Sequence, residues 1–170
     1  LMRTIAALQD ADSGTITLGD VDVEKDKQGL REMLGYLPQE FGVYPKVSAI
    51  DLLDHMAVMK GITDTKRRKE QVDSLLYQVN LWESKDQKLG TFSGGMKQRF
   101  GIAQALLGDP KIIIVDEPTA GLDPMQRNRF HNLLSEIGEN VVVILSTHIV
   151  DDVSDLCNDC LLYTSRAHET

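Results

Sequence analysis

Long hydrophobic runs are absent from this sequence, although a helix that crosses a bilayer needs roughly 20 apolar residues. The two longest aliphatic runs, Lys111–Val115 and Val141–Leu145, have the length of buried strands instead. The amino-terminal residues also lack the pattern of a secretory signal. The sequence therefore indicates neither membrane-spanning helices nor a secretory leader.

Cysteine is scarce, and the only two cysteines, Cys157 and Cys160, form an isolated C-x-x-C. A zinc site would need two further ligands at a suitable spacing, and a redox pair is expected at a helix start in a thioredoxin-like unit. Neither context is present, so coincidence is the favoured interpretation. The scarcity of cysteine suits a reducing cytosol.

Basic residues are outnumbered by acidic ones, and the formal net charge is -8. Nucleic-acid backbones require clustered Lys and Arg, so this charge argues against DNA or RNA as a partner. Hydrophobic residues at 42% and charged residues at 26% are ordinary for a globular domain. A chain of 170 residues fits one domain, which buries roughly 70% of its unfolded surface.

The second half of the chain alternates helical and aliphatic segments. A helix opens at Ser93-Gly94-Gly95 and ends near Leu107, and the two aliphatic strands that follow are separated by a helix over about 125–137. Strands that are apolar throughout and alternate with a helix predict a parallel sheet covered on both faces. Active sites in such sheets lie at the carboxyl ends of the strands.

The first half gives weaker signals. Residues 1–8 show helical spacing with no N-cap before them, so we expect the chain to begin within a helix. Residues 15–18 have the pattern of a short strand, and a polar connection follows as far as residue 28. Residues 34–39 have the pattern of a short strand that runs into a loop, since Pro38 prevents further strand pairing. Apolar residues recur at helical spacing over 48–78, with a polar break.

Two adjacent carboxylates, Asp116 and Glu117, end the first aliphatic strand. Unpartnered buried acids are costly, so this pair suggests a hard cation such as Mg²⁺ in contact with nucleotide phosphates. The alternative, a solvated strand end, stays open for this motif alone. His148 ends the next aliphatic strand, and parallel packing would place it on the same edge; a lone histidine there is more often structural than catalytic.

Ser93-Gly94-Gly95 at a helix start is able to bind an anion. Glycines allow a ligand to approach the backbone, and the unpaired amides and the helix dipole favour negative charge. An ordinary N-cap at Ser93 is the favoured account of this segment when it is considered alone.

Five segments in the same order together resemble the ATP-binding-cassette (ABC) ATPases. Residues 92–99 resemble the signature motif, residues 112–117 the Walker B strand, and residues 120–124 the D-loop. Gln39 resembles the glutamine of the Q-loop, and His148 resembles the switch histidine. The resemblance covers residues 1 to about 159, and it implies a P-loop NTPase-like α/β fold. That fold has a parallel sheet flanked by helices and a small helical subdomain inserted at about 46–107.

The resemblance implies a role for four residues of the chain's own site. Asp116 would bind Mg²⁺ through water, with Gln39 as a second metal contact that also senses the γ-phosphate and relays to the membrane subunit. Glu117 would be the catalytic base, and His148 would contact the γ-phosphate of ATP.

Other residues would complete the site of a second subunit. Ser93, Gly94 and Gly95 would hold the nucleotide of the partner, and Asp123 would line the seam between two subunits that enclose two ATP molecules. Met96 departs from the family's usual glutamine, which removes one polar side chain from this segment.

Both ends of the chain depart from the family. The phosphate-binding pattern G-x-x-x-x-G-K-S/T occurs nowhere in the sequence. In the family it lies immediately before residues like Leu1-Met2-Arg3, so amino-terminal truncation is the expected explanation. Residues 160–170 resemble a translated sequencing adapter and are expected to be a non-native tail, although Cys160–Tyr163 is apolar enough for a strand.

The sequence thus predicts the ATP-hydrolysing subunit of an ABC transporter, with an ABC-2-type exporter the favoured subfamily. The resemblance implies pairing with itself or with another ABC ATPase subunit, and attachment to a transmembrane permease on the cytoplasmic face of the plasma membrane. The alternative is a soluble ABC ATPase acting on DNA or ribosomes. The fragment as given is expected to be inactive without the phosphate loop, and its transported substrate is not readable from this subunit.

Overall fold

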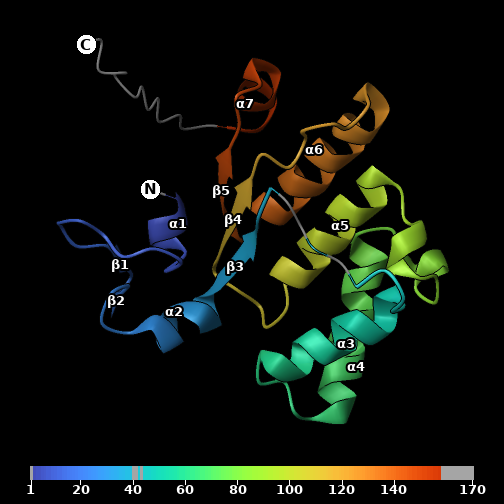
Figure 1. Ribbon diagram of the computed structural model, residues 1–170, viewed down its shortest axis with the longest axis horizontal. Helices are drawn as coiled ribbons and strands as arrows, with labels where there is room; N and C mark the ends of the chain where they lie inside the picture. Colours follow the sequence, from blue (N-terminus) through green and yellow to red (C-terminus); the bar gives the residue numbers. More distant parts are fainter. Residues whose placement is uncertain (1, 40–41, 43, 158–170) are drawn as a thin grey trace.

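The computed structural model describes residues 2–39, 42 and 44–157 (Figure 1). Leu1, the expected tail at 160–170 and the second cysteine of the C-x-x-C lie outside the described residues. The helices are α1 Met2–Ile5, α2 Lys27–Met33, α3 Ala49–Met59, α4 Thr65–Gln78, η1 Trp82–Ser84, η2 Leu89–Thr91, α5 Gly94–Ala105, α6 Pro124–Gly138 and α7 Val150–Leu156. The strands are β1 Thr17–Leu18, β2 Val21–Asp22, β3 Leu34–Leu37, β4 Ile112–Asp116 and β5 Val142–Ser146.

The central sheet is parallel, as the sequence predicts. Its strand order is β3-β4-β5. Leu37 pairs with Val115, and Asp116 pairs with Ser146, so the carboxyl ends of all three strands lie at one edge. This edge is where the expected catalytic residues would meet.

Alternate residues of the sheet face two different clusters of apolar side chains. Ile113 and Val115 of β4 face the cluster formed with α3 to α6, whereas Ile112 and Ile114 face the amino-terminal segment. Figure 1 shows α1, α2 and the short β1–β2 pair on one side of the sheet and α5 and α6 on the other. The prediction of helices on both faces is therefore confirmed for β4, which is buried along most of its length.

The sequence predicts that both faces of each aliphatic strand are covered, but β5 is less buried than that prediction implies. Val142 is 63% exposed, and the other four residues of β5 are only partly buried. The physical reason is its place at the edge of the described sheet, where only one neighbouring strand covers it.

Two glycines set the position of α5 against the sheet. A Cβ at Gly35 of β3 would lie 2.0 Å from the Ala105 carbonyl oxygen, and a Cβ at Gly101 would lie 2.4 Å from Leu37 Cδ1. The helix and strand approach closely because neither glycine has a side chain. α5 therefore lies directly on the strand that leads to Gln39, and α3 and α4 extend beyond it as the helical region (Figure 1).

The amino-terminal segment differs from the sequence prediction. The helix expected over residues 1–8 ends at Ile5, and Ala7 has a left-handed φ of 52°. The polar connection, which was expected to reach residue 28, contains β2 and the first two residues of α2. The sequence pattern missed α2 because only Leu30 of this helix is buried. Asp26 caps α2, since its carboxylate accepts a hydrogen bond from the Gly29 amide at 2.8 Å. No helix within the described ranges is long and apolar enough to cross a membrane.

Candidate functional site

The carboxyl ends of β3, β4 and β5 bring three residues singled out from the sequence into contact. Gln39 Nε2 donates a hydrogen bond to Glu117 Oε2 at 2.9 Å. His148 Nδ1 lies 3.4 Å from the other carboxylate oxygen, Glu117 Oε1. The side chain of His148 is 70% exposed and that of Glu117 is 31% exposed, so both reach solvent and a ligand would have access to them.

Glu117 is held in an unusual backbone conformation, with φ at +44°. This left-handed region is uncommon for residues other than glycine and costs of order 1–3 kcal/mol, so the surroundings must maintain it. The Glu117 amide donates to the carbonyl oxygen of Ser146 at 2.9 Å and to its hydroxyl at 3.3 Å. The next strand therefore fixes the turn that presents the Glu117 carboxylate.

Ser146 also donates its hydroxyl proton to Asp116 Oδ1. The sequence analysis did not identify Ser146, whose only signal was its place at the end of an aliphatic strand. Its contacts with Asp116, the last residue of β4, and with Glu117, which follows it, make Ser146 the link between the two strand ends.

The oxygen atoms at this edge suit a hard cation. Among the residues that the structure describes, no hydrogen bond or ion pair engages Asp116 Oδ2 or the side-chain oxygen of Gln39, whose nitrogen Nε2 is the atom that faces Glu117. Within the described residues, no group of three or more His, Cys, Asp or Glu side chains is arranged to hold a metal by itself. Mg²⁺ commonly uses one or two carboxylates together with phosphates and water, so the residues present fit it.

Besides burial, the negative charge of Asp116 affects the pKa of a neighbouring tyrosine, Tyr36. Burial raises the pKa of the Tyr36 hydroxyl, and the nearby Asp116 carboxylate raises it further. The tyrosine therefore stays neutral beside the acidic edge.

Ser93, Gly94 and Gly95 form the first turn of α5. The Ser93 hydroxyl accepts a hydrogen bond from the Met96 amide at 3.3 Å, which confirms the N-cap alternative of the sequence analysis. A hydroxyl that accepts one bond still has a proton to donate, so capping and anion binding are compatible. Ser93 and Gly94 are exposed at the helix start. The Met96 side chain packs against the hydrophobic core.

Asp123 lies next to this turn because α5 and α6 begin side by side. It caps α6, with Oδ1 accepting from the Gln126 amide at 2.8 Å. A Cβ at Gly95 would lie 3.1 Å from Gln126 Cδ, so only glycine fits this approach without displacing the glutamine. The structure thus gathers the predicted residues into two groups, and no hydrogen bond or ion pair in the described part of the chain joins them.

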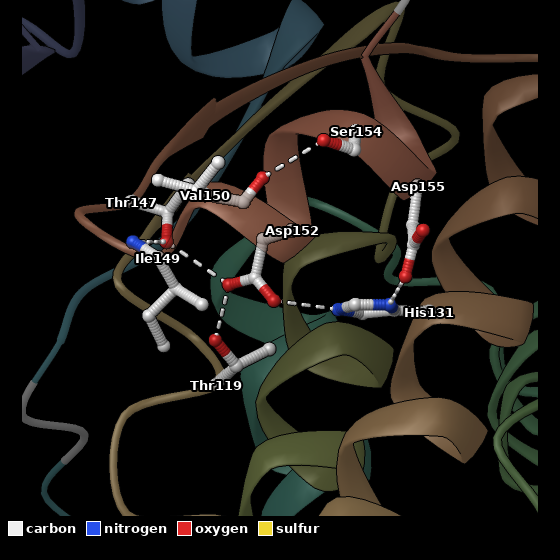
Figure 2. A network of polar contacts seen from close by, with 8 residues as sticks. All are labelled: Thr119, His131, Thr147, Ile149, Val150, Asp152, Ser154 and Asp155. Carbon is white, nitrogen blue, oxygen red and sulfur yellow. Dashed lines mark hydrogen bonds and ion pairs between the residues drawn. The ribbon is translucent and has the colours of Figure 1, made fainter.

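A buried polar network joins α6 and α7 to the loops that follow β4 and β5 (Figure 2). Asp152 of α7 is fully buried and accepts hydrogen bonds from Thr119, Thr147 and His131. The sequence analysis missed this network, since an aspartate within a polar helix has the appearance of a solvated residue. The nearest signal was that Thr119 and Thr147 each lie within two residues of a predicted site residue.

Known proteins match this chain along most of its length. A family model described as ABC transporter matches residues 1–120. The probable multidrug ABC transporter ATP-binding protein YbhF of Escherichia coli (strain K12) is 36% identical over 163 residues, which cover 95% of this chain and 28% of that protein. The linearmycin resistance ATP-binding protein LnrL of Bacillus subtilis (strain 168) is 36% identical over 155 residues, covering 91% of this chain and 50% of that protein.

The fold has a solved counterpart. A structure described as the dimeric, post-hydrolysis state of the ATP-binding cassette MJ0796 bound to ADP and Pi has a TM-score of 0.76 and 24% sequence identity, and the match covers 91% of this chain and 71% of that one. The present chain spans half or less of the two bacterial relatives above. Because the family model covers most of its residues, the chain belongs to the ABC transporter family.

Proposed function

We propose that this chain carries the ATP-hydrolysing edge of an ABC transporter subunit. The observation that supports the proposal most directly is the position of Glu117, whose carboxylate lies between the Gln39 amide and the His148 ring. A carboxylate presented to solvent at a strand end, beside a histidine, has the parts needed to activate water for phosphoryl transfer.

Each residue of this edge has a separate task in the proposed mechanism. Glu117 accepts a proton from the attacking water, and the Gln39 amide fixes the orientation of the carboxylate through its hydrogen bond. His148 presents its imidazole toward the γ-phosphate. Asp116 and Gln39 would hold Mg²⁺, which supplies charge neutralisation for the phosphates when it is bound.

The second group of residues fits a partner's nucleotide. The start of α5 offers backbone amides, a hydroxyl proton and the positive end of a helix of 12 residues. We propose that Ser93, Gly94 and Gly95 contact the ATP of an opposite subunit, with Asp123 at the seam. The partner is a second copy of the chain or a related ABC ATPase subunit.

The names of the relatives support an exporter at the membrane. YbhF is described as a probable multidrug transporter protein and LnrL as a linearmycin resistance protein, both of which suggest outward transport. We propose that the chain works on the cytoplasmic face of the plasma membrane, attached through a permease subunit. The net charge of -8 disfavours the alternative role on DNA or ribosomes.

The phosphate-binding loop provides a test of the proposal. Grafted before Leu1, the segment that precedes the aligned residues in LnrL should give a chain that binds and hydrolyses Mg-ATP. The 170-residue chain alone should show no binding at millimolar nucleotide, because Asp116 and Glu117 repel phosphates when no amides and lysine hold them.

Calorimetry with Mg-ATP on both chains measures this difference. Binding by the ungrafted chain would contradict the part assigned to the phosphate loop. A folded grafted chain that binds ATP without hydrolysing it would contradict the proposed catalytic edge.

A further inference from the structure

Asp152 carries a charge in a place where an unpaired charge is unfavourable. It is 0% exposed and is the only residue of α7 that is buried. Burial raises the pKa of its carboxyl, but hydrogen bonds from Thr119, Thr147 and His131 outweigh burial and lower the pKa below its ordinary value of 3.8. Asp152 is therefore an ionised carboxylate whose charge is satisfied by three side chains.

One oxygen of this carboxylate connects the two loops that carry the hydrolytic residues. Oδ2 accepts from Thr119 Oγ1 at 2.5 Å and from Thr147 Oγ1 at 2.9 Å (Figure 2). Thr119 follows Glu117 by two residues, and Thr147 directly precedes His148. A shift of either threonine therefore moves a loop that ends at the reacting edge.

The threonine hydroxyl also fixes the local backbone around His148. Thr147 Oγ1 accepts from the Ile149 amide at 3.0 Å while it donates to Asp152, so the turn containing His148 is closed on itself and tied to α7. Without Asp152 the Thr147 hydroxyl would be free to rotate, and the turn would lose its hydrogen bond to α7.

The other oxygen connects the network to α6. His131 Nε2 lies 2.8 Å from Asp152 Oδ1 and must carry the proton, because an ionised carboxylate only accepts. His131 is itself buried on the helix that Asp123 caps. Its other ring nitrogen, Nδ1, lies 3.5 Å from Asp155, which has no contact with either threonine (Figure 2).

We propose that Asp152 is a positioning residue that fixes the loop carrying His148 against the loop carrying Glu117. This inference rests on the proposed ATP hydrolysis at that edge. Asp152 touches neither ATP nor water in the proposal, and it acts only through Thr119 and Thr147. The competing account is that Asp152 merely anchors α7, in which case its loss would affect stability alone.

Steady-state ATP hydrolysis by the grafted chain separates the two accounts. Asp152→Ala should lower kcat by about tenfold or more while KM for ATP changes by less than about twofold, because misplaced catalytic groups affect the chemical step. Thr147→Val keeps the shape of the side chain and removes only its hydroxyl, so it should lower kcat in the same direction. Asp155→Asn is the matched control on the same helix and should leave kcat unchanged.

Repeating the Asp152 substitution in a chain that lacks the proposed catalytic base shows whether Asp152 acts through that base. In a Glu117→Gln chain, Asp152→Ala should slow hydrolysis by less than about a further twofold, since a positioned base is no longer there to be misplaced. If Asp152→Ala and Thr147→Val lower the melting temperature but leave kcat unchanged well below it, Asp152 is only an anchor and the proposal is overturned.

Hydrogen exchange on the 170-residue chain tests the positioning without any ATP hydrolysis. Thr147→Val and Asp152→Ala should each speed exchange of the Ile149 amide by about tenfold or more, because local opening of that turn becomes easier. Asp152→Ala alone should also speed exchange of the Leu122 amide, which donates to the Thr119 carbonyl at 3.1 Å. Asp155→Asn should change neither.

Hydrogen exchange and ATP hydrolysis test the positioning role and the proposed function separately. Unchanged exchange at Ile149 and Leu122 in Asp152→Ala would overturn the positioning role even if the grafted chain hydrolyses ATP. A grafted chain that does not depend on Glu117 would overturn the proposed function, whereas the exchange data would still show whether Asp152 holds the two loops.

Discussion

Glu117→Gln is expected to slow ATP hydrolysis by the grafted chain at least about 10²-fold, the low end for the loss of a general base. The amide has nearly the shape of the carboxylate, so the turn held by Ser146 should persist and nucleotide binding should remain nearly intact. Because hydrolysis is proposed to open the dimer, the variant should accumulate as an ATP-bound dimer. Phosphate release and size-exclusion chromatography with ATP measure the two effects.

A matched control separates charge from position. Glu136 is an exposed glutamate on α6 away from the strand ends, and Glu136→Gln makes the same chemical change. This control should hydrolyse ATP at the unmodified rate. A Glu117→Gln chain that turns over as fast as the control would remove Glu117 from the mechanism.

Ser93→Arg is expected to abolish dimer formation driven by ATP. An arginine at the first turn of α5 would place bulk and charge where the partner's γ-phosphate is proposed to lie, and it would also remove the N-cap hydroxyl. The loss of the cap alone costs about 1 kcal/mol and should leave the domain folded. Nucleotide binding by the monomer should survive, since its own phosphate loop is elsewhere.

Size-exclusion chromatography of the Glu117→Gln chain, with and without Ser93→Arg, measures this effect directly. Ser135→Arg, at an exposed position of α6, adds the same charge away from the start of α5 and should leave the dimer intact. Loss of ATP binding by the Ser93→Arg monomer would mean that Ser93 contacts nucleotide within its own chain. That result would contradict the proposed exchange of residues between subunits.

The sheet and the edge proposed to be catalytic were predictable because their signals are local and strong. Aliphatic runs on either side of a helix predict parallel strands, and β4 and β5 lie within one residue of the predicted bounds. Parallel pairing then brings Glu117 and His148 to one edge, as the register of Asp116 with Ser146 shows. Gln39 could be assigned only from the family resemblance, since nothing in the short strand before it points to chemistry.

The supporting contacts were not predictable, because they depend on how distant segments pack. The left-handed conformation of Glu117 and the double contact of Ser146 arise only when β4 and β5 pair. The burial of Asp152 depends on α7 folding over Thr119 and Thr147. α2 escaped prediction for a related reason, since a helix that buries one leucine leaves almost no apolar periodicity.

Mixing two impaired chains provides the most direct test of the account's central claim, a hydrolytic site completed by two subunits. A dimer of one grafted Ser93→Ala chain, which loses the hydroxyl without adding the bulk and charge that block dimer formation, and one grafted Glu117→Gln chain contains one site in which an intact Glu117 faces an intact Ser93 of the partner. Phosphate release from Mg-ATP by the mixture should exceed the sum of the separate chains by about tenfold or more, because one complete site is restored. A mixture that releases phosphate no faster than that sum would contradict a site shared between two chains.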